Sequence, residues 1–188
     1  ARLHGHAQGR YKVVTMEGGF HGRTYAALTA TAQPKYHEGL QPLVPGFTYV
    51  PYNNLGAVAA AIDGQTAAVL VEPIQGEGGI NIPSPDYLPG LRKLCDERGV
   101  LLILDEVQTG LGRTGEWFAY QHSGTAPDIP TCAKALAGGV AAGVMMATTE
   151  VAKALKPGTH ASTFGGNPIA CRAGLAAVET ITANTVLR

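Results

Sequence analysis

Two short segments of the chain are apolar at every position, and they constrain its fold more than any other feature. Residues 67–71 read AAVLV and residues 100–104 read VLLIL. A strand with one face in water alternates apolar and polar residues, whereas a strand covered on both faces is apolar throughout. The sequence therefore predicts an α/β fold, with a mostly parallel sheet and helices on both of its faces.

The rest of the chain alternates between short apolar runs and helical patterns. We expect strands over residues 11–16, 47–51, 67–72, 100–105 and 143–148, and helices over residues 22–32, 55–62, 86–98, 151–155 and 168–181. Pro85 and Asp86 are typical of a helix start, and Gly99 is typical of a helix end. This alternation predicts a doubly wound domain.

Composition argues against several classes of protein. The 188 residues include 14 Lys and Arg against 14 Asp and Glu, so there is no basic excess of the kind that nucleic-acid-binding domains carry. The apolar runs are far shorter than a membrane span. Cys95, Cys132 and Cys171 lack the spacing of a metal or redox motif, which favours free thiols in a reducing cytosol. The six histidines are scattered, so we expect no metal site; His21 alone stands in a loop of the candidate site described next.

Two acidic residues directly follow the apolar runs. Glu72 ends the first run and Asp105 ends the second, and a glycine-rich loop comes after each. In parallel sheets, ligands bind outside the carboxyl ends of the strands, and glycines let the backbone approach a ligand closely. A helix cap or a surface turn is the alternative use of such acids. We interpret this edge of the sheet as a candidate ligand site.

Lys134 lies among small apolar residues and is followed by a glycine pair. A desolvated lysine has a lowered pKa and can form a Schiff base, although an ordinary exposed lysine would be favoured if this residue stood alone. Pyridoxal phosphate needs such a lysine, a carboxylate at its ring nitrogen and an aromatic ring on its face. Asp105, Gln108 and Phe20 suit the carboxylate, a hydrogen bond to the phenolic oxygen and the stacking ring. For Phe20, a place in the core remains the alternative.

Six motifs together resemble the class III (ornithine-type) aminotransferases. They are FHGRT at residues 20–24, VEPIQGEGG at 71–79, LDEVQTGLGRTG at 104–115, PDI at 127–129, AKAL at 133–136 and STFGGNP at 162–168. They stand in the family's order and at its spacing, and they span nearly the whole chain. Within the class, the resemblance is greatest to the acetylornithine branch, with the ornithine branch next.

The resemblance implies the cofactor-binding domain of a fold-type I transferase that uses pyridoxal 5'-phosphate. Lys134 would bond the cofactor and later move a proton, and Asp105 would pair with the pyridine nitrogen. Gln108 would contact the phenolic oxygen, while Phe20 and Val107 would pack on opposite faces of the ring. The full set of cofactor-binding residues that the resemblance implies is Phe20, Asp105, Glu106, Val107, Gln108, Lys134 and Thr163.

The resemblance also implies how substrate and partner bind. Arg23 would hold a substrate carboxylate by a bidentate fork, Ser162 would contact the substrate close by, and Glu77 would stand near the amine entrance and help to select a diamino substrate. Thr163 would reach the phosphate of the partner subunit's cofactor, so the protein would be a homodimer with shared active sites. Glu72 would support the site without taking part in the chemistry.

The activity implied is transfer of the terminal amine of N2-acetylornithine to 2-oxoglutarate, in arginine biosynthesis in the cytoplasm. Ornithine and 4-aminobutyrate are the alternative donors. Because such enzymes are about twice this length, we expect residues 1–188 to be the large domain, with an N-terminal segment and a C-terminal small domain lying outside it. Ala137 and Ala161 stand where the family usually has glycine, and Ala141 where it often has proline; these changes concern the fine geometry of substrate binding.

Two functions of other classes compete with this one. Residues 110–115 match G-x-G-x-x-G, the dinucleotide-binding pattern, which requires glycines at a strand–helix turn and an acid about twenty residues later. Here five residues separate the apolar run from the first glycine, and Asp128 stands between Pro127 and Pro130 in an expected loop. A non-catalytic domain with a decayed site is the other competitor, and the intact Lys134 and Asp105 argue against it.

Overall fold

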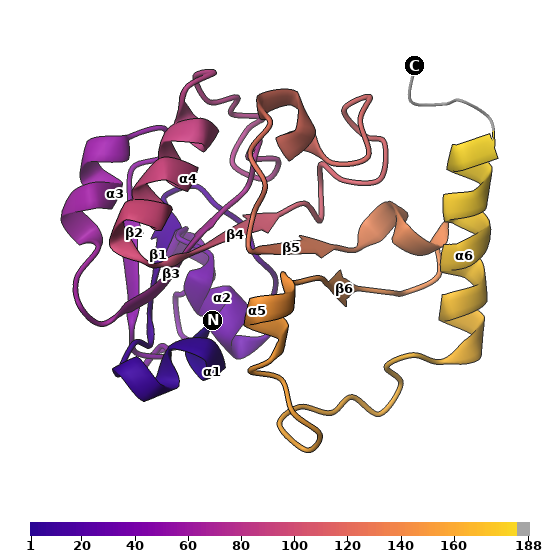
Figure 1. The fold of residues 1–188 in the computed structure, drawn as a ribbon, viewed down its shortest axis with the longest axis horizontal. Coiled ribbons are helices and arrows are strands. Elements are labelled where there is room, and N and C mark those ends of the chain that lie inside the picture. The colour runs from indigo at the N-terminus through magenta and orange to yellow at the C-terminus, as the bar shows by residue number, and fades with distance from the viewer. Residues whose placement is uncertain (184–188) are drawn as a thin grey trace.

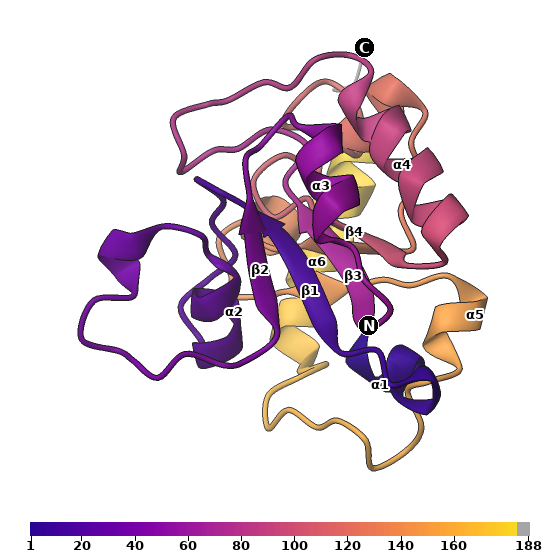
Figure 2. The same ribbon diagram turned by 90° about the vertical axis from the view of Figure 1, so that its left-hand side faces the viewer.

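A computed structural model describes residues 1–183 and places the strands in one sheet, in the order β2-β1-β3-β4-β5-β6 (Figure 1). The strands are β1 (Lys12–Met16), β2 (Phe47–Val50), β3 (Thr66–Val71), β4 (Leu101–Asp105), β5 (Ile129–Cys132) and β6 (Val144–Met145). Strands β1 to β5 run parallel, and β6 pairs antiparallel to β5. Figure 2 shows β2, β1 and β3 side by side. The prediction of a mostly parallel sheet is confirmed.

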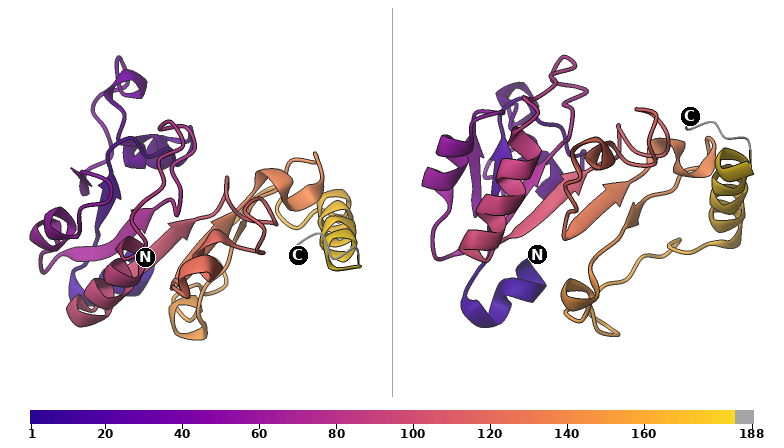
Figure 3. Two further views of the ribbon diagram at one scale, coloured as in Figure 1. Left: turned by 90° about the horizontal axis from the view of Figure 1, so that it is seen from above. Right: turned by 45° about the horizontal axis from the view of Figure 1, so that its top comes forward.

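The α-helices are α1 (Arg2–Gly5), α2 (Tyr25–Ala30), α3 (Leu55–Ala61), α4 (Tyr87–Arg98), α5 (Thr149–Ala152) and α6 (Pro168–Ala183). Within residues 1–183 the short 3-10 helices are η1 (His6–Gln8), η2 (Pro34–Tyr36), η3 (Ala119–Ser123) and η4 (Lys134–Ala137). Seen from above, α2 lies on one side of the sheet and α3 and α4 lie on the other (Figure 3, left), so the predicted covering of both faces is confirmed. No helix within residues 1–183 is long and apolar enough to cross a bilayer.

The hydrophobic core lies between the sheet and helices α3 and α4. It joins Val69 and Val71 of β3, Leu102 and Leu104 of β4, and Leu91 of α4, all of them fully buried. Strand β3 is buried on both faces, as its composition predicts. Strand β4 is fully buried on its core face, whereas Leu101 and Ile103 on the other face are only half-buried. The prediction from the second apolar run is therefore right for one face and only partly right for the other.

Strand β5 was not predicted, because Pro127 and Pro130 indicated a loop. The strand forms nevertheless, since Pro130 lacks only the N–H donor and its carbonyl accepts a hydrogen bond of 3.0 Å from Met146 N. Asp128 N donates to Leu102 O at 2.9 Å just before the strand begins. The expectation of a loop over residues 127–130 is thus wrong from Ile129 onwards.

Several element boundaries also differ from those expected. Helix α2 begins at Tyr25 and not at residue 22, because Gly22 has a φ of +123° and Thr24 is extended, and neither conformation is helical. The strand predicted over residues 143–148 shortens to β6, and the helix predicted over residues 151–155 is observed earlier, as α5. Helix α4 ends as predicted at Gly99, whose φ is +59° and whose N–H donates to the carbonyls of the last turn.

Helix α6 stands at one end of the molecule, beyond β6 and away from α3 and α4 (Figure 1). It packs against η4, and none of its described residues is buried. Ile169, Leu175 and Val178 are among its exposed apolar side chains. The short helix that begins with Lys134 therefore rests against a helix that is itself largely exposed.

Candidate active site

A small cavity of about 80 Å³ lies at the carboxyl ends of the central strands. Its lining consists of Phe20, His21, Gly22, Glu72, Glu77, Asp105, Val107, Gln108 and Lys134. Parallel strands bring their carboxyl ends to one edge, so segments that are remote in the sequence meet there. Five of the seven residues predicted to bind cofactor, and one of the three predicted to bind substrate, are brought together in this cavity.

Asp105 is fixed at the end of β4 by contacts on both of its carboxylate oxygens. His21 Nδ1 lies 2.7 Å from Oδ2, and the side chains of His21 and Asp105 are only 3% and 8% exposed. Oδ1 accepts hydrogen bonds from Val107 N at 3.0 Å and from Thr131 Oγ1 at 3.4 Å. A carboxylate held in this way presents its negative charge in one fixed position.

His21 is a site residue to which the sequence alone assigned no contact. Its position directly after Phe20, in the glycine-rich loop, was the only signal in the sequence. Its Nε2 atom is buried and has no hydrogen-bond partner in the described part of the chain. The imidazole thus links the loop before α2 to the end of β4 through Nδ1 alone.

Glu72 joins two loops that border the cavity. Its Oε2 accepts a hydrogen bond of 3.0 Å from Phe20 N, and its Oε1 accepts one of 3.4 Å from Gly76 N. Burial raises the pKa of the Glu72 carboxyl, while the hydrogen bond from Phe20 and the nearby His21 act to lower it. These contacts fit the supporting role expected for Glu72, because they set the position of the aromatic residue.

Glu106 is buried beside Asp105 but lines no part of this cavity. It accepts hydrogen bonds from the Thr109 hydroxyl, from Ala119 N at 3.1 Å and from Tyr120 N at 2.9 Å. Burial raises the pKa of its carboxyl against the effect of these three donors. Its observed contacts hold the loop over residues 107–118, and a contact between Glu106 and the cofactor remains a prediction.

The G-x-G-x-x-G run lies in this same loop. Gly112 and Gly115 have positive φ angles, and η3 follows the loop, so the glycines do not stand at the junction of a strand and an α-helix. Asp128 precedes β5 and does not follow a strand. Both requirements of the dinucleotide fingerprint are therefore unmet in the structure.

Lys134 begins η4 immediately after the last strand that runs parallel in the sheet. Its Nζ donates a hydrogen bond to Gln108 Oε1, and its residue as a whole is exposed. Its φ is +48°, in the left-handed region that residues other than glycine rarely adopt. Backbone strain of this kind is concentrated at functional sites. A Cβ atom at Gly76 would lie 2.8 Å from Gln108 Cγ, so the absence of a side chain there leaves room for Gln108.

The residues predicted to bind substrate are only partly brought together. Glu77 lines the cavity and is exposed. The Arg23 guanidinium carbon lies 5.4 Å from the centroid of the Phe20 ring, beside the cavity. Ser162 and Thr163 do not line it, and both are exposed. For Thr163 this is compatible with the predicted contact to the partner subunit's cofactor, and the roles of both residues remain predictions.

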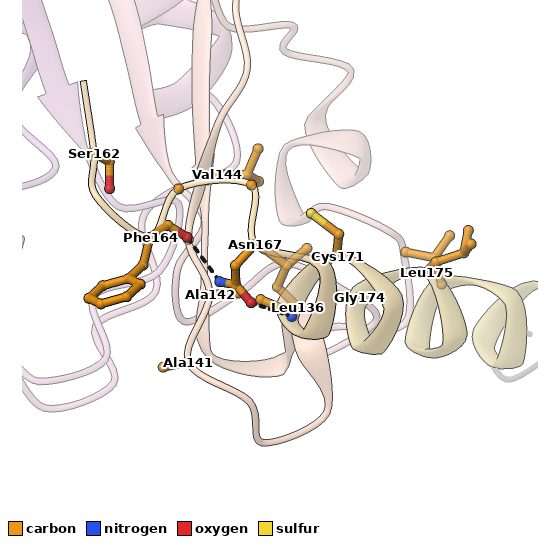
Figure 4. Close-up of a pocket in the computed structure, with 15 residues that line it drawn as sticks. Leu136, Ala141, Ala142, Val144, Ser162, Phe164, Asn167, Cys171, Gly174 and Leu175 are labelled. Carbon is orange, nitrogen blue, oxygen red and sulfur yellow. Dashed lines mark hydrogen bonds between the residues drawn. The ribbon is translucent and has the colours of Figure 1, made fainter. Parts of the chain in front are cut away.

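Ser162 lines a second and larger cavity of about 720 Å³, beside the segment that follows η4 (Figure 4). Phe164 and Leu175 belong to the mainly apolar lining. Asn167 directly precedes α6: its Nδ2 donates to Phe164 O at 2.9 Å, and its Oδ1 accepts from Ala170 N at 2.9 Å. This cavity lacks a buried carboxylate and a lysine, so the smaller cavity is the candidate for acid–base chemistry.

The smaller cavity fits the ring of pyridoxal phosphate in its chemistry. Asp105 is a buried carboxylate suited to a protonated ring nitrogen, and Phe20 and Val107 line the same space, as two ring faces require. The Lys134 amine reaches Gln108 across it. No group of three or more His, Cys, Asp or Glu side chains among the described residues could hold a metal ion.

Comparisons with known proteins agree with this chemistry. The family described as aminotransferase class-III matches residues 1–188. The chain is 52% identical to the acetylornithine aminotransferase of Aquifex aeolicus over 172 residues, which cover 92% of this chain and 46% of that protein. It is 54% identical to the acetylornithine aminotransferase of Nitrosomonas europaea over 96% of this chain and 47% of that protein. The chain thus spans about half the length of these curated relatives.

Solved structures are similar over almost the whole chain. The crystal structure of the ornithine aminotransferase from Toxoplasma gondii matches with a TM-score of 0.95 and 38% identity, over 99% of this chain and 46% of that one. An (S)-enantioselective omega-transaminase from Thermomicrobium roseum matches with a TM-score of 0.93 and 31% identity, over 98% of this chain and 48% of that one. Fold, site and sequence therefore agree that this chain belongs to the class III aminotransferases.

Proposed function

We propose that residues 1–188 form the large, cofactor-binding domain of a longer homodimeric transaminase that uses pyridoxal 5'-phosphate. We propose further that this protein moves the terminal amine of N2-acetylornithine to 2-oxoglutarate, in arginine biosynthesis in the cytoplasm. The observation that carries the proposal is the meeting of Lys134, Gln108 and the buried Asp105–His21 pair at one edge of the sheet. About 50% identity to proteins named acetylornithine aminotransferase supports the choice of donor.

Each residue of the cavity has a place in this chemistry. When bound, pyridoxal phosphate supplies an electron sink that operates through its protonated ring nitrogen. Asp105, oriented by His21, would stabilise the positive charge on that nitrogen, and Phe20 and Val107 would pack against the ring. Lys134 Nζ would hold the cofactor and, when free, would act as the base that takes a proton from the substrate carbon and as the acid that returns it. Gln108 accepts a hydrogen bond from Lys134 Nζ and so orients the amine.

The substrate contacts belong to the same proposal. Arg23 binds the donor's carboxylate, Glu77 attracts its distal ammonium group and Ser162 contacts the substrate. Thr163 completes the phosphate site of the partner subunit. A second candidate donor is ornithine, which is favoured by the 38% identity and TM-score of 0.95 to the ornithine aminotransferase.

An absorbance experiment on the full-length protein tests both donor and cofactor. The protein is loaded with pyridoxal phosphate, and its visible band is followed on addition of N2-acetylornithine and then of 2-oxoglutarate. Loss of the band followed by its return supports the proposal. A band that responds to ornithine or 4-aminobutyrate and not to acetylornithine would overturn the donor only, and the lack of any band would overturn the cofactor.

A further inference from the structure

The segment between α2 and β2 projects from the body of the molecule (Figure 2) and carries Tyr36 on η2. The Arg23 guanidinium carbon lies 4.2 Å from the centroid of the Tyr36 ring and 5.4 Å from that of the Phe20 ring. The two rings contact each other edge to face, with centroids 5.8 Å apart and an interplanar angle of 78°. Arg23 is therefore held by two aromatic rings, one of which lines the cavity that contains Lys134.

This mode of holding leaves the charge of Arg23 available. Within the described chain, Arg23 has no carboxylate oxygen within 4.0 Å, whereas Arg92 is paired with Asp96 at 2.6 Å and with Asp128 at 2.9 Å. An arginine held by acids has its charge neutralised and its N–H groups occupied. An arginine held over an aromatic ring keeps its N–H edge free for an incoming anion, because the ring attracts the cation through its electron-rich face.

A second cation lies near the same ring. Lys35 Nζ is 4.7 Å from the Tyr36 centroid, and the described part of the chain gives it no carboxylate partner either. Two cations around one ring repel each other, and the negative face of the ring offsets part of that repulsion. The Tyr36 ring therefore has two cationic side chains over it, either of which could attract a carboxylate.

We propose that Tyr36 is a positioning residue, which holds the Arg23 guanidinium beside the cavity so that it binds the carboxylate of the amino donor. The proposal rests on the proposed function, in which Arg23 is the residue that binds this carboxylate. Tyr36 acts through Arg23 and touches no reacting atom. It therefore sets the affinity for donors that carry a carboxylate and leaves the rate of the chemical steps unchanged.

The test uses the full-length protein loaded with pyridoxal phosphate, and two donors that differ in one group. N2-acetylornithine carries the carboxylate, and N-acetylputrescine is the same molecule without it. A cation–π contact of ordinary strength predicts that Tyr36→Leu raises KM for acetylornithine about 3- to 10-fold, with kcat changed less than about twofold. The KM for acetylputrescine stays unchanged. Tyr36→Phe keeps the ring and restores the affinity.

Phe47→Leu is the matched control, because it removes another ring near an arginine: Arg2 lies 5.4 Å from the Phe47 centroid, and neither residue lines the cavity. This variant should leave KM for both donors unchanged. In an Arg23→Ala background, Tyr36→Leu should have no further effect. Equal increases in KM for both donors, or the same increase without Arg23, would overturn the positioning role.

A binding measurement separates this proposal from the choice of donor. Pentanoate carries a carboxylate and no amine, and its binding is followed by titration of the visible band in the unreacted protein. If acetylornithine fails as a donor, the proposed function is wrong in that respect, yet Tyr36→Leu should still weaken pentanoate binding about 3- to 10-fold. If acetylornithine reacts and pentanoate binds both proteins equally, the role of Tyr36 alone is overturned.

Discussion

His21 Nδ1 lies 2.7 Å from Asp105 Oδ2, although 84 positions separate the two residues in the sequence. The contact joins the loop before α2 to the end of β4, and both side chains are almost fully buried. Asp105 Oδ2 has this one partner in the described part of the chain, whereas Oδ1 has two. The Oδ2 atom of the carboxylate that would face the cofactor nitrogen is therefore held by a single imidazole.

Replacing His21 by Leu should leave Asp105 Oδ2 buried without its partner. Loss of a buried, charged hydrogen bond lowers the free energy of unfolding by about 2–3 kcal/mol. The affinity for pyridoxal phosphate should fall as well, because the carboxylate is then held through Oδ1 only. Urea unfolding and cofactor titration measure the two effects. His122→Leu, at an exposed position, is the control, and equal behaviour of the two variants would contradict the linking role of His21.

Lys134→Ala should remove the visible absorption of lysine-bound cofactor from the full-length protein and abolish transamination. The physical reason is that the variant lacks the amine that, in our proposal, bonds the cofactor and moves the proton. Lys93→Ala, on the exposed side of α4, should keep both the band and the activity. An unchanged visible spectrum in Lys134→Ala would refute the assignment of this lysine.

Gly76→Ala should disturb the site more than it disturbs the fold. The new Cβ atom would lie 2.8 Å from both Cγ and Nε2 of Gln108, and a flexible side chain moves away at a cost within about 1 kcal/mol. Gln108 would then lose its hydrogen bond with Lys134, and the visible band of the bound cofactor should shift. The control is Gly64→Ala, whose Cβ atom meets nothing within 4 Å. A large loss of stability without a spectral shift would count against this reading.

Glu106→Gln should destabilise the loop over residues 107–118. All three groups that contact Glu106 donate hydrogen bonds, so an amide must turn its NH₂ toward one of them. A buried donor left without an acceptor costs about 1–3 kcal/mol, measurable as a lower free energy of unfolding. Glu116→Gln, on the exposed part of the same loop, should not change the stability. Equal stability of both variants and the parent would show that the loop does not depend on this carboxylate.

The contribution of Glu72 to the free energy of unfolding should fall as the pH rises above 4.5. Burial raises the pKa of this carboxyl from its ordinary value of 4.5, so the native state keeps the proton to a higher pH than the unfolded chain does. Between the two pKa values the native state binds more protons, and its stability declines with pH; below 4.5 both states are protonated and the cost is absent.

Glu72→Gln cannot ionise, and it separates this effect from other titrations. The stability of the parent relative to the variant should be greatest below pH 4.5 and should shrink as the pH rises. Glu106, whose pKa is also raised by burial, is present in both proteins and so cancels from the difference. Denaturant unfolding at a series of pH values measures this difference in stability between parent and variant. A difference that stays constant across the series would exclude a raised pKa at Glu72.

Much of the fold follows from local chemistry in the sequence. The apolar run at residues 67–71 is buried on both faces of β3, and Gly99 ends α4 in the left-handed conformation expected of it. Strand β5 was not predicted, because a proline makes a strand unlikely in any local sequence pattern. Pro130 is accommodated in the strand because its carbonyl accepts a hydrogen bond from Met146 N, and this bond exists only once the chain has folded.

The part of the site that lies at the carboxyl ends of strands could be predicted from the sequence. Asp105 and Glu72 follow buried runs, so their meeting at one edge could be expected from parallel pairing alone. The pairing of His21 with Asp105 and the stacking of Arg23 on Tyr36 could not, because each depends on how a loop returns to the sheet. The same limit applies to Ser162, whose place in a separate cavity no spacing rule indicates.

The left-handed backbone of Lys134 has a consequence for the stability of this chain. A residue with a side chain is strained there by roughly 1–2 kcal/mol, and glycine is not. Lys134→Gly should therefore yield a protein that is inactive and more stable than its parent. A lysine at this position lowers the stability of the fold, which is the cost expected if its side chain has the chemical role that we propose.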